Sequence, residues 1–460
     1  MRILNQPLRL GALLLFSLFG ALTFETSLAG PPTQLTVGLY PYVPRVDQFQ
    51  AAVETEWQKV HPDVQLNFLT FDQWDGGYTV TPPANADVYV FDALYFETYR
   101  RQGLLEPLAP SEVNDPDDFL PYAVDGVKAE GKFYAIPQLG CANLLIYDRR
   151  DTAITQATTL NQLTNTLKQC TYTNQIPPDR RGLLISMGDG LTSAALYLDT
   201  AHDITQQYPY PQPTTPSDLD PVAIADLKQV LSLSSFLNAT VPTPGDYDFA
   251  TYFSNGWGRA YVGFSESMSQ LSESARSNIA FKIMPFANAS PARADFYADV
   301  IGVNPTVNQR GTRALAVQLA NLMAATETMI KSTGRTGNLP PQYLMVTRPS
   351  IFQALQKTDS IYSRMYQLSK SSDPVMFKLN SHGPTWLASM QDNIEHEILE
   401  NPSCGCGFSA AQLITDKKFA AAICTNTCST HGGWNGQWSN SPPTTNLGSV
   451  CGCNSCPTLP

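Results

Sequence analysis

The sequence predicts an α/β protein of two lobes, followed by a small cysteine-rich C-terminal appendage. Its 460 residues are too many for one simple hydrophobic core. Strand-like and helical segments alternate in the first half of the chain, as they do in sheets covered by helices. After Asn401 the composition changes sharply to Cys, Gly, Ser, Asn and Thr, which is too poor in large apolar residues to fold without disulfides.

Two strands and a helix are predicted near the N-terminus. Residues 35–40 alternate apolar and polar side chains as a half-buried strand does, and 64–69 form the next strand. Between them, 47–60 carry apolar residues at helical spacing, with Asp47 in place to cap the helix. This succession is typical of an α/β sheet.

Two apolar runs carry polar residues that are candidates for a binding site. Residues 86–92 form a run of the kind buried in a parallel sheet, and the run ends in Asp92. Residues 136–148 form a second run, which contains Cys141. Ligands of α/β sheets bind beyond the carboxyl ends of the strands, so a site is expected at such strand ends.

The later segments continue the alternation. An aromatic, glycine-punctuated stretch at 251–274 leads into Glu266 and a helix, and Asp220 and Pro221 are placed as the N-cap and first residue of another helix. The remaining predictions are a turn between two short strands at 128–132, helices at 160–170, 221–237, 313–325, 351–368 and 386–399, and a strand at 296–303.

The first 29 residues have the features of a secretory signal peptide. Arg2 and Arg9 precede an apolar run, and Ser27-Leu28-Ala29 supplies small residues before a cleavage site near Ala29/Gly30. We therefore expect a secreted or periplasmic protein, with a retained membrane anchor as the less favoured alternative. No later segment approaches the roughly 20 apolar residues of a membrane span.

The net charge of -11 excludes some classes of partner. An acidic surface argues against nucleic acid and anionic membranes, because their phosphates repel it. Small-molecule partners are expected instead, and the protein is expected to be a monomer.

Nine cysteines in an oxidising compartment leave at least one thiol unpaired within the chain. Two lie in the body, Cys141 and Cys170, and seven lie after Asn401. If Cys170 joins those seven in four bridges, Cys141 is left over, but a bridge between Cys141 and Cys170 is also open. For the C-terminal cysteines a zinc module is the alternative, which the compartment disfavours.

Four segments resemble extracellular solute-binding proteins of the maltose-binding type. They are 38–44 (GLYPYVP), 86–92 (ADVYVFD), 103–108 (GLLEPL) and 134–137 (YAIP). The resemblance implies a periplasmic-binding-protein-like (type II) fold, in which crossing strands join two α/β lobes around a cleft. The implied parts are a signal peptide (1–29), lobe 1 (30–140 and 286–335), lobe 2 (141–285 and 336–400) and a disulfide-stapled tail (401–460).

Three segments resemble the thiaminase I family, which uses the same fold. They are 135–147 (AIPQLGCANLLIY), 262–268 (VGFSESM) and 296–304 (FYADVIGVN), and the likeness spans roughly 34–400. It implies that Cys141 is a nucleophile and Glu266 its general base, with Asp92 and Asp299 facing the substrate's amine and cationic portions. The implied aromatic walls are Tyr42, Tyr78, Tyr247 and Tyr297. Phe264 departs from the pattern, because a tyrosine is expected there.

The implied chemistry suits these residue types. Thiamine joins an electron-poor aminopyrimidine to a cationic thiazolium, and a thiolate is a suitable soft nucleophile for the pyrimidine ring. A carboxylate can take the thiol proton and later return a proton to the substrate. The second nucleophile is an organic base or a thiol, and no metal or organic cofactor is expected.

Each candidate also has a plainer interpretation. Cys141 can be an inert buried thiol, Glu266 a solvated glutamate in a first helical turn capped by Ser265, and Asp92 and Asp299 cap or turn residues. The rival function is a non-catalytic solute-binding protein for thiamine, a related pyrimidine or a sugar. A cysteine–histidine site has no support from the five histidines, and only the tail favours a cell-surface structural protein.

Overall fold

The computed structural model describes 33–167, 182–187, 190–208, 212–213, 215–237, 248–256, 258–288, 292–371, 373–399, 407–412, 414, 417–439 and 449–453. The predicted signal peptide, Cys170 and Tyr247 lie outside the described residues.

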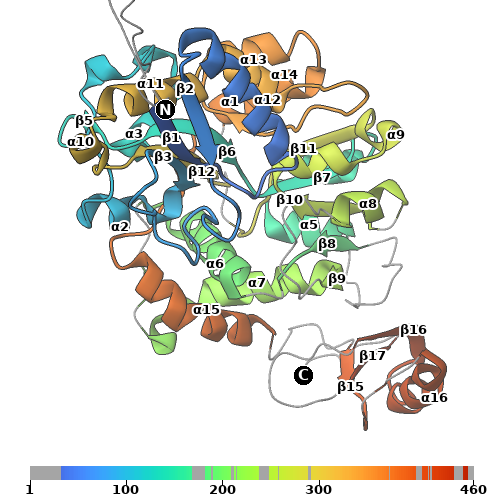
Figure 1. Cartoon of the computed structure of the whole chain (residues 1–460). Coiled ribbons are helices and arrows are strands. Elements are labelled where there is room, and N and C mark those ends of the chain that lie inside the picture. The colour runs from blue at the N-terminus through green and yellow to red at the C-terminus, as the bar shows by residue number, and fades with distance from the viewer. Residues whose placement is uncertain are drawn as a thin grey trace, which may run out of the picture.

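A seven-stranded sheet forms one half of the body (Figure 1). Its order is β13-β6-β12-β3-β1-β2, and β14 pairs with β12. These strands are β1 (Thr33–Gly38), β2 (Val64–Phe68), β3 (Val88–Asp92), β6 (Ile136–Cys141), β12 (Asp295–Val303), β13 (Met345–Val346) and β14 (Val375–Met376). β1 runs parallel to β2 and β3, whereas β12 runs antiparallel to β3 and β6. All of β3 is buried, as its apolar run predicts.

A five-stranded sheet forms the other half of the body. Its order is β11-β7-β10-β8-β9. The strands are β7 (Leu144–Asp148), β8 (Leu183–Ile185), β9 (Ser234–Leu237), β10 (Ala260–Gly263) and β11 (Ile279–Ile283). Three helices, α6 (Gly190–Thr205), α7 (Pro221–Leu233) and α15 (Gly383–Leu399), pack on one another below this sheet in Figure 1. The α/β class of the prediction is confirmed.

The chain passes between the two sheets over short distances. β6 ends at Cys141 and β7 begins at Leu144, while β11 ends at Ile283 and β12 begins at Asp295. Both sheets are therefore built from separated parts of the sequence. β13 and β14 return to the seven-stranded sheet, whereas α15 packs on α6 and α7. The lobe boundaries stay a prediction.

The other elements of the body are short. They are η1 (Ala93–Tyr95), α2 (Phe96–Arg101), η2 (Pro110–Glu112), η3 (Pro116–Asp118), α3 (Pro121–Val127), β4 (Lys128–Ala129), β5 (Lys132–Phe133), α4 (Thr152–Gln156), α5 (Leu160–Leu167), η4 (Pro216–Asp218), α8 (Asp248–Ser254), η5 (Ser265–Gln270), α9 (Glu273–Arg276) and α10 (Val307–Arg310). The remaining helices of the body are α1 (Val46–Val60), α11 (Arg313–Met323), α12 (Thr326–Thr333), α13 (Pro349–Leu355) and α14 (Ser360–Ser371). No helix in the described ranges is both long and apolar enough to cross a membrane.

Local capping decides where several helices begin. Asp220 caps α7 as predicted, since its Oδ1 accepts the backbone N–H of Val222 at 2.8 Å. The predicted cap at Asp47 is wrong, because α1 begins one residue earlier and Asp47 falls in its first turn. The single helix predicted at 351–368 is two helices, because Asp359 accepts the backbone N–H of Ile361 and starts α14.

The C-terminal tail has a small core of its own. α16 (Lys417–Thr427) lies beside a three-stranded sheet of β15 (Gly407–Ser409), β17 (Val450–Cys453) and β16 (Trp434–Ser439), in that order. Its buried cluster consists of Ile414, Ala420, Cys424, Cys428, Cys451 and Cys453. Disulfides join Cys424 to Cys451 and Cys428 to Cys453, so these four predicted half-cystines are confirmed and are not zinc ligands.

Candidate active site

Cys141 lies at the point where the chain leaves the seven-stranded sheet. It is the last residue of β6 and pairs in register with Tyr297 of β12. Gly140 precedes it at a position with little room for a side chain, because a Cβ there would lie 3.1 Å from the hydroxyl of Tyr122. Cys141 is the free cysteine among the described residues and keeps part of its surface accessible. The local fold therefore presents an unpaired thiol at a strand end.

Carboxyl groups converge on this thiol. Asp92 ends β3, and Asp299 lies opposite it in β12. Burial raises the pKa of the Cys141 thiol well above its ordinary value. Nearby carboxylates raise that pKa further; in order of decreasing effect they are Glu266, Asp299, Asp92 and Asp199. The thiol is therefore protonated in the empty site at neutral pH.

Asp92 is fixed by two hydrogen bonds. The hydroxyl of Tyr78 donates to its Oδ2 at 2.6 Å, and the backbone N–H of Leu94 donates to its Oδ1 at 2.9 Å. It thus caps η1 and also faces the group of acidic residues. Burial raises its pKa to about 6, although both hydrogen bonds lower it. Burial and the charges of Asp92 and Glu266 raise the pKa of Asp299 well above its ordinary value.

Glu266 is not a solvated helix-start residue. It lies in η5, a 3-10 helix whose cap position is Phe264 rather than Ser265. Only 4% of its surface is exposed, and the hydroxyl of Ser265 donates to its Oε2 at 3.4 Å. The plainer interpretation of this residue is therefore wrong.

Two groups of aromatic rings accompany the carboxyls. In the first, the ring of Tyr42 lies 5.4 Å from that of Tyr78 and 5.6 Å from that of Tyr40. In the second, the ring of Tyr297 lies 5.5 Å from Phe264 and stacks on Phe377 at 4.5 Å. The structure thus brings Tyr42 and Tyr78 together and places Tyr297 beside Cys141.

Sequence reasoning missed several residues of this region. Tyr40 and Phe377 belong to the aromatic groups, and Tyr40 lies within the segment 38–44 that resembles solute-binding proteins. Asp199 of α6 accepts hydrogen bonds from the Nδ2 of Asn143 at 2.5 Å and the hydroxyl of Tyr297 at 3.0 Å. Asn143 follows Cys141 by two residues, but no sequence pattern indicated Asp199 or Phe377.

A protein-family comparison and a curated relative identify the family. The model described as "Thiaminase-1 domain" matches 142–287. A Thiaminase-1 from Paenibacillus thiaminolyticus is 34% identical over 361 residues, which are 77% of this chain and 85% of that protein. This chain belongs to the thiaminase I family. It is an enzyme of that type.

Solved structures agree with the thiaminase I assignment. Clostridium botulinum thiaminase I in complex with thiamin has 33% identity and a TM-score of 0.73, and the match covers 79% of this chain and 99% of that one. Thiaminase I from Bacillus thiaminolyticus has 32% identity and a TM-score of 0.72, with the same coverage. A maltose-bound protein of T. maritima, at 13% identity and a TM-score of 0.61, shares the fold. The predicted maltose-binding-type fold is confirmed, and the model described as "Bacterial extracellular solute-binding protein" matches 42–203.

The tail of this thiaminase I relative matches a different family. The model described as "Mannan-binding protein" matches 418–453, which spans α16 to β17. The thiaminase-type body and the tail therefore have separate relatives.

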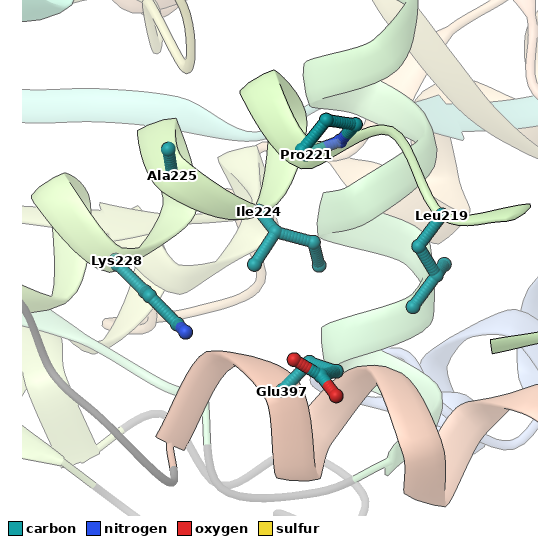
Figure 2. A pocket seen from close by; sticks show the side chains of 6 residues that line it. All are labelled: Leu219, Pro221, Ile224, Ala225, Lys228 and Glu397. Carbon is teal, nitrogen blue, oxygen red and sulfur yellow. The ribbon is translucent and has the colours of Figure 1, made fainter. Parts of the chain in front are cut away.

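A surface pocket lies away from the predicted site residues. It opens between α7 and α15 with a volume of about 360 Å³. Figure 2 shows Lys228 of α7 and Glu397 of α15 facing into it among apolar side chains. No residue implied for thiaminase I chemistry lines this pocket.

Proposed function

We propose that this enzyme cleaves thiamine by exchanging its thiazole for a second nucleophile, through a covalent bond between Cys141 and the pyrimidine. The observation that carries the proposal is the free Cys141 thiol, partly accessible and surrounded by acidic side chains. The alternative of a non-catalytic solute-binding protein leaves a reactive residue at this position without a purpose.

The proposed reaction balances in four steps. Glu266 takes the proton of Cys141, and the sulfur adds to a carbon of the pyrimidine, whose ring nitrogen takes up a proton. The bond between the methylene carbon and the thiazolium nitrogen then breaks, and its electron pair leaves with the thiazole as a neutral amine. An organic base or a thiol next adds to the methylene carbon. Loss of the cysteine sulfur and of the ring proton restores the aromatic pyrimidine.

The acidic surroundings of Cys141 suit a cationic substrate. Carboxylates that raise the thiol pKa in the empty site attract a thiazolium, and the aromatic rings can stack on a flat cation. The bound positive charge offsets the carboxylates and lowers the thiol pKa. Binding of the substrate therefore promotes formation of the nucleophile.

The direct test is the loss of thiamine in a solution of the purified protein with pyridine or aniline as co-substrate. We expect thiamine to disappear and an exchanged pyrimidine product to appear by liquid chromatography. If calorimetry shows thiamine binding but no thiamine is consumed, the solute-binding alternative replaces this proposal.

The KM for thiamine should fall by about tenfold as the pH rises through about 6. The reason is that the pKa of Asp92 is about 6, so its carboxylate, which attracts the cation, forms over this range. Asp92→Asn should remove this step from a plot of KM against pH. The exposed carboxylate of Asp63 supplies the control, and Asp63→Asn should retain the step. A step of full size in Asp92→Asn would contradict the assignment.

A second function is proposed for the tail, which is binding of a mannan-type polysaccharide. The family match at 418–453 favours it, and Trp434 and Trp438 of β16 are partly exposed. We expect immobilised mannan to retain the full chain and soluble mannan to release it. Trp438→Ala, with unchanged thiamine turnover, should weaken retention; equal elution from mannan and unmodified resin would contradict the proposal.

Secretion or export to the periplasm accompanies both functions. The two tail disulfides require an oxidising compartment, and the match to an extracellular family points the same way. We propose that 1–29 direct this export and are removed.

A further inference from the structure

Two buried aspartates meet behind the active site. Asp199 lies on α6, and Asp295 is the first residue of β12. Asp295 is 3% exposed and Asp199 7%. Asp295 Oδ1 is hydrogen-bonded to the Nδ1 of His202 at 2.6 Å, but its Oδ2 is buried without a donor group beside it. Asp199 lines the same small cavity as Asp295, and hydrogen bonding between the two carboxyl groups shifts the pKa of both.

Two buried carboxylates in contact are unfavourable unless a proton lies between them. When two carboxyl groups share one buried site, the charge of one raises the pKa of the other strongly, and burial adds to the effect. Burial raises the pKa of Asp295 to about 8, and it raises the pKa of Asp199 well above its ordinary value, as does the charge of Asp295. A cavity of about 10 Å³ borders the pair, which is room for about one water molecule rather than for a hydration shell.

Among the described residues, the basic side chains beside the pair are those of Arg293 and His202. Arg293 lines the same cavity, but its guanidinium is hydrogen-bonded to Gln206 at 2.7 Å and to Asp373 at 2.7 Å. Burial lowers the pKa of His202, so its imidazole is neutral at pH 7. The titratable groups that face the pair are His202 and Asp203 of α6, Tyr208, Arg293, Tyr297 of β12 and Cys141 of β6.

We infer that Asp199 and Asp295 share one buried proton, and that the pair so formed positions Tyr297 in the active site. Neutral His202 donates to Asp295 Oδ1, and the shared proton joins Asp295 Oδ2 to Asp199. Asp199 Oδ2 also accepts hydrogen bonds from the hydroxyl of Tyr297 at 3.0 Å and from the side-chain amide of Asn143 at 2.5 Å.

The two residues held in this way flank Cys141 on both sides. Tyr297 pairs with Cys141 across β6 and β12, and Asn143 follows it in the connection to β7. Asp199 and Asp295 are therefore positioning residues. The proton also limits the negative charge near the thiol, because Asp199 is one of the groups that raise the pKa of Cys141.

Asp295→Asn is the decisive variant, because an asparagine imitates the protonated aspartate. Its Oδ1 can accept from His202, and its Nδ2 can donate to Asp199 at every pH. Infrared difference spectra of wild type minus variant, without substrate, should show the C=O band of a protonated carboxyl at pH 7. That band should disappear as the pH rises through about 8. Absence of the band would overturn the inference whether or not the protein consumes thiamine.

The kinetic test rests on the proposed function, whereas the infrared test does not. Wild-type kcat should decline above about pH 8, since two carboxylates then repel one another and Tyr297 loses its anchor. Asp295→Asn should keep kcat at pH 7 within about threefold and lack this decline. A decline at the same pH in the variant would overturn the positioning role.

Asp203 provides a matched control on the same helix. It is equally buried, with a pKa that burial raises to about 7, but it accepts backbone N–H groups of Phe286 and Arg293 rather than Tyr297. Asp203→Asn should retain the decline of kcat at high pH. The decline should move at most to lower pH, because the charge of residue 203 no longer acts on Asp295. If Asp295→Asn fails to fold, Asp199→Asn must shift the pH at which the infrared band disappears, and an unchanged midpoint overturns the inference.

Discussion

Cys141→Ser should lower kcat for thiamine exchange by about 10⁴-fold or more and leave the protein folded. Loss of a nucleophile from a concerted catalytic group has effects of this size. A serine hydroxyl is far less acidic than a thiol, and the carboxylates around this position oppose its ionisation further. The measurement is thiamine consumption with saturating pyridine, together with a thermal melt followed by circular dichroism.

The thermal melt distinguishes lost chemistry from lost structure. Serine is close to cysteine in size and the position is partly accessible, so the melting temperature should change by only a few degrees. Cys141→Ala should be equally inactive. Turnover by either variant within tenfold of wild type would show that the sulfur is not the nucleophile.

Glu266→Gln should lower kcat by about 10²- to 10⁴-fold and at the same time make Cys141 easier to alkylate. Turnover falls because the amide cannot accept the thiol proton. Alkylation by iodoacetamide accelerates because the charge of Glu266, which raises the pKa of Cys141, is gone. Both rates are measured at pH 7 under otherwise identical conditions. The alkylation rate is followed by mass spectrometry of the peptide that contains Cys141.

The opposite signs of these two changes separate a base from a structural residue. If Glu266 only supported the fold, its replacement would slow turnover without accelerating the alkylation of Cys141. Asp299→Asn is the matched comparison, because its charge also raises the pKa of Cys141. It should accelerate alkylation too, but weaken thiamine binding more than it lowers kcat. Slower alkylation in Glu266→Gln would contradict the proposed electrostatics.

Local sequence patterns predicted the strands that carry the site, but they did not predict the contacts between those strands. The apolar run that ends in Asp92 is β3, whereas the run 136–148 that contains Cys141 is two strands, β6 and β7, in different sheets. The placement of Asp299 opposite Asp92 depends on the register of β12 against β3, and the register of β12 against β6 shifts between Asp299 and Val300. Such long-range registers come from packing between sheets, which no short segment encodes.

The residues that the analysis missed share a physical reason. Asp199 follows the middle of a helix whose side chains are mostly buried, and Asp295 lies one residue before the segment 296–304. Their partnership arises only when α6 packs near β12. The wrong cap at Asp47 and the split of 351–368 are smaller, local errors. Helix α1 begins one residue earlier than predicted, and a single hydrogen bond to Asp359 marks the start of α14.

The high thiol pKa of Cys141 has a consequence for the lifetime of the protein outside the cell. Oxidation and thiol–disulfide exchange proceed through the thiolate, so a thiol that stays protonated is a poor attacker of other sulfurs. The same chain carries the disulfides Cys424–Cys451 and Cys428–Cys453, which a reactive thiolate would scramble. If Cys141 ionises only when the cationic substrate binds, as we propose, it can share one polypeptide with oxidised cysteines in surroundings that attack ordinary reactive thiols.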